Sequence, residues 1–220
     1  MRFLSALLIA GCLSVTTFAA NAKEPTNLHF VKLKLIRYHD SGEYEKDITA
    51  QIDKAITYLK ARLAKGDFHG KKPALVLDID ETSLSNYPNL VLLDFGGTLE
   101  EIRADIDKSQ DPVIAPTLKL YQFAQAHHVA VFFITGRREN ERQDTIENLQ
   151  KAGYHDWKQL TLRDAANKST LAEDYKTPVR KQITENGYDI VLNIGDQQSD
   201  LTGGYADKAI KLPNPYYFLP

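Results

Sequence analysis

Two aspartates, Asp78 and Asp80, end the apolar run in the stretch ALVLDIDETS at residues 74–83. An ionised carboxylate avoids a buried, low-dielectric environment unless a cation, a proton or hydrogen bonds compensate its charge. Two carboxylates one residue apart also repel each other. A single aspartate after a strand is explained by capping of the next helix. For the pair, the alternative is a site that binds a divalent metal ion, and the rest of the chain decides between them.

Further polar residues follow other apolar runs or stand near a helix start: Thr135, Lys176, Asp196 and Asp200. Taken singly, a turn explains Thr135, solvent exposure explains Lys176, and a loop or a helix cap explains the two aspartates. Taken together, they place several carboxylates, a hydroxyl and an ammonium on one rim of a sheet, where ligands of open parallel sheets bind. Such clustering indicates a functional site.

This combination of groups suits phosphoryl transfer through an aspartyl phosphate. One carboxylate acts as the nucleophile and divides a hard hydrolysis into two easier steps. A hard cation with oxygen ligands, typically Mg²⁺, neutralises the approaching anions. A lysine and a threonine hydroxyl hold the remaining phosphate oxygens. The second carboxylate protonates the leaving oxygen and later deprotonates the attacking water. A bound metal and phosphate would therefore explain why two adjacent aspartates are tolerated.

The elements that must position these groups follow an alternating pattern typical of a doubly wound, parallel α/β sheet of the Rossmann-like kind. Four apolar segments are predicted to form its strands: Ala74–Ile79, Val129–Thr135, Gln159–Leu162 and Ile190–Ile194. Helices are predicted at residues 116–127, 139–152 and 177–185. The stretch at about 84–115 has weak periodicity and is predicted to be a small cap. The C-terminal LPNPYYFLP is expected to pack against the domain.

Residues 23–73 are predicted to be an N-terminal helical segment. An apolar stripe at helical spacing supports this prediction: Tyr44, Ile48, Ile52, Ile56, Leu59 and Leu63. Ser41 is predicted to be the N-cap of this helix, and Gly66 is predicted to end it. The stripe itself is explained by packing on a core.

Residues 1–22 are predicted to be a signal peptide, because a run of small and apolar residues precedes the A-x-A box at residues 20–22. The run is too short to be a membrane span. Cys12, the only cysteine, follows a stretch resembling a lipobox, so lipid anchoring is the alternative to cleavage. An exported, periplasmic or secreted protein is expected. The near balance of 27 Lys+Arg and 29 Asp+Glu argues against a nucleic-acid binder.

In order and context, the polar motifs resemble those of the haloacid dehalogenase (HAD) superfamily of phosphatases. The match comprises D-x-D-x-T at residues 78–82, Thr135, Lys176 and G-D-x-x-x-D at residues 195–200. The stretches ITGRRENERQDTIENLQKAGYHDW, IGDQQSDL and KLPNPYYF are similar to the acid phosphatase branch that includes plant vegetative storage proteins. Bacterial class B and class C acid phosphatases belong to the same wider group. The resemblance covers about residues 74–219 and is loose at 84–115.

The resemblance implies a HAD-like core at residues 74–220 and a metal-dependent acid phosphatase acting on small phosphomonoesters. It implies that Asp78 is the nucleophile and Asp80 the general acid and base. It also implies one Mg²⁺ held by Asp78, the backbone carbonyl of Asp80 and Asp196, with Asp200 supporting the metal shell. Thr135 and Lys176 would hold the phosphoryl group. No role is assigned to Asp94.

Four alternatives compete with this assignment. A non-catalytic storage or ligand-binding relative stays open, although Asp78 and Asp80 are both present. A receiver-like switch orders its acidic pair and phospho-acceptor differently along the chain. A phosphohistidine mechanism lacks a pocket motif around any of the six histidines. A zinc site lacks Cys or spaced His ligands.

Overall fold

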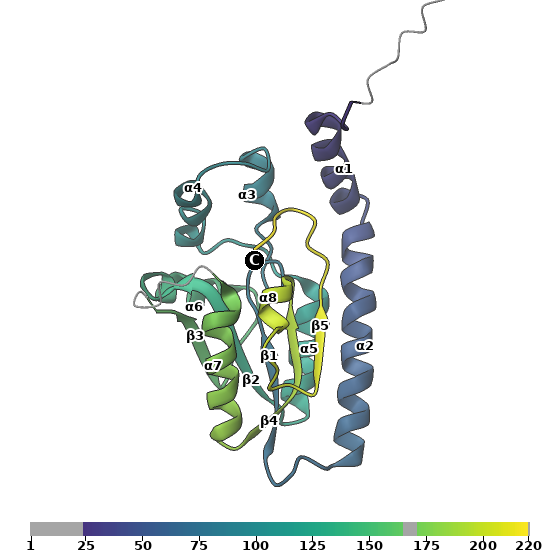
Figure 1. Cartoon of the computed structure of the whole chain (residues 1–220), viewed down its shortest axis with the longest axis vertical. Helices are drawn as coiled ribbons and strands as arrows, with labels where there is room; N and C mark the ends of the chain where they lie inside the picture. Colours follow the sequence, from purple (N-terminus) through teal and green to yellow (C-terminus); the bar gives the residue numbers. More distant parts are fainter. Residues whose placement is uncertain (1–23, 165–170, 220) are drawn as a thin grey trace, which may run out of the picture.

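Five parallel strands form one sheet in the computed structural model, which describes residues 24–164 and 171–219 (Figure 1). The strand order is β3-β2-β1-β4-β5. The strands are β1 Lys72–Leu77, β2 Ala130–Arg138, β3 Gln159–Arg163, β4 Tyr188–Gly195 and β5 Lys208–Lys211. The predicted signal peptide lies outside the described residues.

Helices cover both faces of this sheet, which confirms the predicted doubly wound fold. They include α2 Glu43–Lys65, α5 Ala115–Ala126, α6 Arg142–Lys151 and α7 Ala172–Glu185. Side chains alternate along the buried strands. On β1, Leu75 and Leu77 join the core cluster with α2, α5 and α6. The intervening Ala74 and Val76 pack with Ile183 of α7 on the other face.

The predicted N-terminal helical segment is two helices, α1 Leu28–Asp40 and α2. The predicted N-cap at Ser41 is wrong: Ser41 is the C-cap of α1, and Gly42 precedes α2 with a φ of 80°. A glycine adopts this left-handed conformation without a steric penalty, so the chain turns there. Gly66 ends α2 as predicted. The apolar stripe of α2 faces the core.

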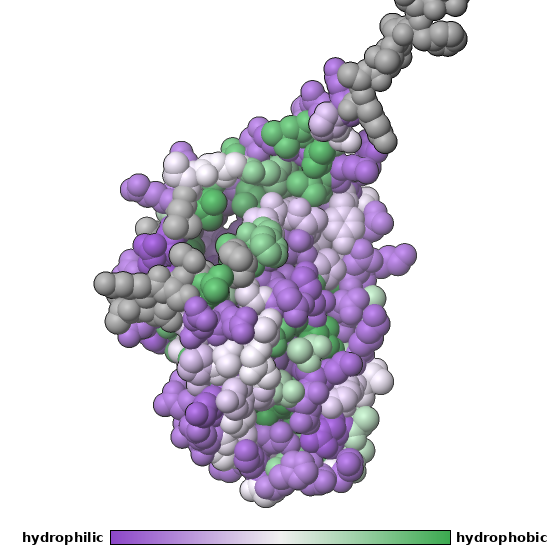
Figure 2. Space-filling view, viewed as in Figure 1, coloured by the Kyte–Doolittle hydropathy of each residue, from purple (hydrophilic) through white to green (hydrophobic). Residues whose placement is uncertain are grey.

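Three short helical turns follow β1 and lie beyond the carboxyl ends of the strands (Figure 1). They are α3 Tyr87–Leu92, α4 Leu99–Arg103 and η1 Ile106–Lys108. Figure 2 shows hydrophobic side chains gathered over α1 and α3 at this end of the molecule. No helix within the described ranges is long and apolar enough to cross a bilayer.

Two elements differ from the sequence prediction. Strand β5 was not predicted, because Lys208–Lys211 carries a single buried apolar residue, Ile210. Helix α7 begins at Ala172 rather than Thr177, so Pro178 stands inside it. The extra turns place Lys176 on the helix. The remaining α8, Gln198–Leu201, is one turn after β4.

Candidate active site

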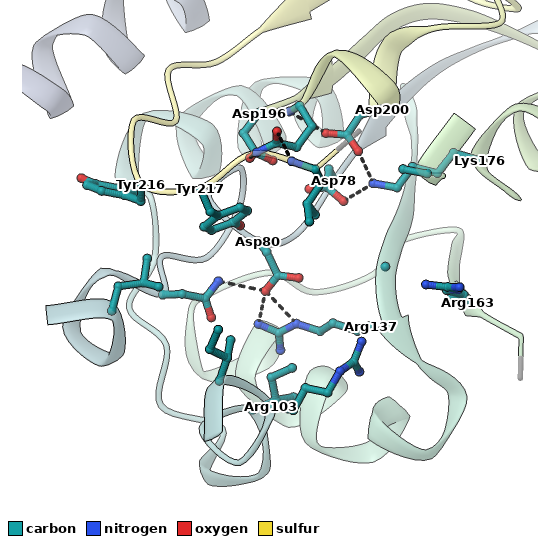
Figure 3. Close-up of a pocket in the computed structure, with 18 of the residues that line it drawn as sticks. Asp78, Asp80, Arg103, Arg137, Arg163, Lys176, Asp196, Asp200, Tyr216 and Tyr217 are labelled. Atoms are coloured by element: carbon teal, nitrogen blue, oxygen red, sulfur yellow. Dashed lines mark hydrogen bonds and ion pairs between the residues drawn. The ribbon is translucent and has the colours of Figure 1, made fainter. Parts of the chain in front are cut away.

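Three buried aspartates meet beyond the carboxyl ends of two neighbouring strands. Asp78 follows β1, Asp196 follows β4, and Asp200 lies in α8. One carboxylate oxygen from each lies within 4.8 Å of the others. Figure 3 shows all three converging on the same side of the pocket. The structure therefore brings together three carboxylates that are far apart in the sequence.

The pairing of β1 with β4 places the first two of these aspartates. Leu77 is in register with Ile194, and the amide of Asp78 donates to the Ile194 carbonyl at 3.0 Å. Gly195 then allows α8 to fold back closely. A Cβ at this glycine would lie 2.5 Å from the Cβ of Asp200. Any other residue would push the third carboxylate out of the cluster.

Lys176 bridges two of the aspartates from helix α7. Its Nζ lies 2.5 Å from Oδ1 of Asp78 and 2.6 Å from Oδ1 of Asp200. Its side chain is only 4% exposed. Burial alone would lower the pKa of Lys176, but the two carboxylates raise it above its ordinary value. The side chain is therefore a fixed positive charge.

The cluster holds more negative charge than one ammonium can balance. Burial and the nearby Asp200 together raise the pKa of Asp196 to about 7, against a hydrogen bond from Asn214. Burial likewise raises the pKa of Asp78 well above its usual value, although Lys176 opposes the change. Close, desolvated carboxylate oxygens are the donor set that hard divalent cations prefer. These residues therefore fit a metal such as Mg²⁺.

These pKa shifts predict how stability depends on pH. A carboxyl group whose folded pKa is raised stabilises the fold fully below its unfolded pKa, near 4, and loses that contribution as the pH rises through its folded pKa. Metal-free protein should therefore melt several degrees lower at pH 8 than at pH 5, and Mg²⁺ should remove most of the difference. Thermal denaturation in EDTA and in Mg²⁺ measures this. Equal melting temperatures in EDTA would contradict it.

Asp80 turns away from the aspartate cluster and contacts an arginine. Nε and Nη2 of Arg137 lie 3.1 and 2.8 Å from its Oδ1, and the same Nη2 lies 2.8 Å from Oδ2 of Asp111. Burial would raise the pKa of Asp80, but the guanidinium and its hydrogen bonds lower it below the ordinary value. Arg137 therefore orients Asp80 in this structure (Figure 3).

The two predicted phosphate-binding residues are placed differently. Lys176 lines the cavity, as do Asp78, Asp80, Asp196 and Asp200. Thr135 is fully buried within β2, and its hydroxyl accepts a hydrogen bond from the amide of Arg137 at 3.1 Å. Of the described residues, its neighbours Gly136 and Arg137 line the cavity, whereas Thr135 does not. Asp94 is exposed and pairs with Lys32.

A cavity of about 380 Å³ opens in front of these groups. Its upper wall in Figure 3 carries the aspartate cluster, and arginines lie opposite. Apolar residues of the segment between β1 and α5 complete it: Leu90, Phe95, Ile102 and Ile106. The cavity is large enough for a small molecule beside a tetrahedral anion. The segment at 84–115, predicted to be a small cap, therefore contributes a wall of the site.

Several residues of the site were not predicted. Arg137 follows Thr135 and Gly136 directly, so its position after an apolar run could have marked it as a candidate site residue. Asp111 and Arg103 lie in the stretch with weak periodicity, where no pattern marked them. Asn214 and Tyr217 lie in the C-terminal segment, whose predicted packing against the domain is confirmed by hydrogen bonds to Asp196 and Glu81.

Comparison with known proteins adds an independent observation. The family model described as HAD superfamily, subfamily IIIB (acid phosphatase), matches residues 8–220. Acid phosphatase 1 of Solanum lycopersicum is 36% identical over 180 residues, covering 80% of this chain and 69% of that protein. The stem 28 kDa glycoprotein of Glycine max is 37% identical over 156 residues, covering 67% of this chain and 61% of that protein. The chain thus spans between six and seven tenths of these two relatives.

Vegetative storage protein 1 of Arabidopsis thaliana is also similar, with 30% identity over 184 residues, 82% of this chain and 67% of that protein. Among solved structures, the class C acid phosphatase from Bacillus anthracis superposes with a TM-score of 0.74 at 26% identity, covering 87% of this chain and 86% of that one. Family, fold and relatives agree with the predicted resemblance and with an enzyme that hydrolyses phosphomonoesters. The chain belongs to the HAD superfamily, subfamily IIIB, the acid phosphatases.

Proposed function

We propose that this protein is an exported, metal-dependent acid phosphatase that hydrolyses small phosphomonoesters through an aspartyl phosphate on Asp78. The observation that carries the proposal is the buried cluster of Asp78, Asp196 and Asp200 with Lys176, on one wall of a small-molecule cavity. Four ionisable groups are rarely buried so close together without a ligand to compensate them. In the related class C acid phosphatase from Bacillus anthracis, tungstate, a tetrahedral oxyanion, is bound.

The proposed reaction has two displacement steps. A carboxylate oxygen of Asp78 attacks phosphorus, and the bond from phosphorus to the leaving oxygen breaks. Asp80, whose pKa Arg137 lowers, must first take up a proton, which it then gives to that oxygen. Water then attacks the aspartyl phosphate while Asp80 accepts its proton, and inorganic phosphate leaves Asp78 as a free carboxylate. Lys176 holds phosphate oxygens during both steps, and Thr135 supports the cavity wall through the hydrogen bond from the Arg137 amide to its hydroxyl.

A Mg²⁺ ion would be held by Asp78, the backbone carbonyl of Asp80 and Asp196, with Asp200 supporting them. When bound, it neutralises the repulsion between nucleophile and phosphate. Asp200 also accepts a hydrogen bond from the amide of Gln197 at 2.9 Å, which fixes one of its oxygens. Lys176 contacts the other oxygen, so the carboxylate is held from both sides.

Metal removal tests the proposal directly. Hydrolysis of para-nitrophenyl phosphate at pH 5 to 6 should be lost in EDTA and restored by Mg²⁺. The mildly acidic pH suits the acid phosphatases, the family to which the chain belongs. Turnover that survives EDTA would contradict the metal requirement. Folded protein inactive under both conditions would favour the alternative, a storage or ligand-binding protein like the vegetative storage relatives.

A further inference from the structure

The C-terminal segment Leu212–Leu219 returns from β5 to the carboxyl ends of the strands (Figure 1). The amide of Leu212 donates to the Gly195 carbonyl at 2.8 Å, and the amide of Leu219 donates to Oε1 of Gln197 at 3.1 Å. Both anchors flank Asp196. The segment is therefore fixed beside a carboxylate of the aspartate cluster rather than elsewhere on the surface.

Asn214 connects this segment to Asp196. Its Nδ2 donates to Oδ2 of Asp196 at 2.7 Å, and Nε2 of Gln197 donates to the same oxygen at 2.6 Å. The hydroxyl of Thr82 donates to the other oxygen at 3.3 Å. Since Leu219 in turn holds Gln197, both amides on Oδ2 depend on the segment. Hydrogen bonds of this kind fix the orientation of a metal-ligating carboxylate.

Tyr217 connects the segment to Glu81, the residue between Asp80 and Thr82 in the chain. Its hydroxyl donates to Oε2 of the fully buried Glu81. Glu81 has a φ of 51°, a left-handed conformation that is strained for a residue with a side chain. Donors surrounding its carboxylate help to hold this turn. The hydroxyl of Tyr217 is one of them.

Asn86 extends this connection to Asp80. Its backbone amide donates to Oε1 of Glu81 at 2.6 Å, and its Nδ2 lies 3.1 Å from Oε2 of the same residue. The same Nδ2 lies 3.1 Å from Oδ1 of Asp80. A continuous chain of hydrogen bonds therefore leads from Tyr217 through Glu81 and Asn86 to the proposed proton-transfer residue.

We propose that the segment Leu212–Leu219 is part of the active site: Asn214 positions the metal ligand Asp196, and Tyr217 positions Asp80 through Glu81 and Asn86. Neither residue is a catalytic residue in this proposal, because each acts through another side chain. The proposal rests on the proposed function, since it refines how that site binds metal and transfers protons. It predicts that Asn214 affects Mg²⁺ affinity and that Tyr217 affects kcat.

Asn214→Ala should weaken Mg²⁺ binding about ten-fold or more, the usual effect of removing a partner of a metal ligand. Calorimetric titration of metal-free protein with Mg²⁺ measures this without any turnover. At saturating Mg²⁺, KM should stay close to wild type. Asn214→Ser, a smaller change, provides a second measurement of the same contact if the alanine variant does not fold.

Tyr217→Phe keeps the aromatic ring and removes only the hydroxyl. We expect kcat at saturating Mg²⁺ to fall about ten-fold, with KM and Mg²⁺ affinity within about two-fold of wild type. Tyr44→Phe is the matched control, because Tyr44 lies on α2 outside the segment and its hydroxyl has no hydrogen-bond partner in the described part of the chain. That control should leave kcat and Mg²⁺ affinity unchanged.

The outcomes separate this inference from the proposed function. If wild type is active and both Asn214→Ala and Tyr217→Phe match Tyr44→Phe in Mg²⁺ affinity and kcat, the inference is overturned. The inference is also overturned if the two variants only melt at a lower temperature, with the Mg²⁺ affinity of Asn214→Ala and the kcat of Tyr217→Phe unchanged. If wild type binds Mg²⁺ but has no turnover, the proposed function fails, while a weaker Mg²⁺ titration of Asn214→Ala still supports the positioning of Asp196.

Discussion

Asp78→Asn is expected to reduce phosphomonoester turnover by about four orders of magnitude or more, because an amide cannot form the acyl phosphate and loss of a nucleophile removes the covalent route. Asparagine has nearly the same shape as aspartate. It also removes one of three mutually repelling carboxylates, so the metal-free fold should be as stable as wild type or more stable. Steady-state kinetics and thermal denaturation of the same preparation measure both effects.

Asp94→Asn is the control for this substitution. Asp94 is an exposed aspartate outside the cluster, and its only ion pair among the described residues is with Lys32. The same chemical change at Asp94 should leave kcat equal to that of wild type within experimental error. Substantial turnover by Asp78→Asn would contradict the assignment of the nucleophile, and a matching loss in Asp94→Asn would show that the effect is not specific to the cluster.

Lys176→Met is expected to reduce both stability and turnover. Methionine fills a similar volume but leaves Asp78 and Asp200 without their buried counter-charge. Removing one partner of a buried ion pair costs about 3–5 kcal/mol. The free energy of unfolding in EDTA should fall by this order, and Mg²⁺ should restore much of it by supplying positive charge. With Mg²⁺ present, kcat should still fall about 100- to 1,000-fold, because a charge on the phosphoryl group is lost.

Lys181→Met provides the comparison on the same helix. Lys181 is 55% exposed and pairs with Glu185 at 3.7 Å, and exposed pairs of this kind contribute about 0–1 kcal/mol. Neither the unfolding free energy nor the kcat of Lys181→Met should differ appreciably from wild type. A Lys176→Met protein as stable in EDTA as Lys181→Met would contradict the charge balance described for the cluster.

The sequence was sufficient to predict the sheet and the residues at its carboxyl edge. Continuous apolar runs such as Val129–Thr135 identify buried parallel strands, and polar residues at their ends must share one edge of the sheet. This reasoning predicted that Asp78, Asp196 and Lys176 would lie close together. The structure places Lys176 in contact with Asp78 and a carboxylate oxygen of Asp196 within 4.8 Å of one of Asp78. It did not predict β5, because a short edge strand with one buried side chain has no distinctive pattern.

The remaining parts of the site depend on contacts that no local pattern encodes. Arg103 and Asp111 come from short helical turns and loops, and only the folded segment brings them to Arg137 and its neighbours. Tyr217 lies 136 residues from Glu81 in the chain, so no periodicity can indicate their contact. The misassigned Ser41 has a simpler cause, because Gly42 provides the turn that separates α1 from α2.

The most direct test of the central claim is to trap the phosphorylated enzyme in the Asp80→Asn variant. Para-nitrophenolate leaves without being protonated, whereas hydrolysis of the acyl phosphate needs Asp80 as a base. The variant is mixed with Mg²⁺ and para-nitrophenyl phosphate that carries a label on phosphorus. About one equivalent of nitrophenol per enzyme should be released rapidly. Hydroxylamine-labile phosphate should then be found on the peptide that carries Asp78. Label on another peptide, or steady turnover without a rapid first phase, would contradict an aspartyl phosphate on Asp78.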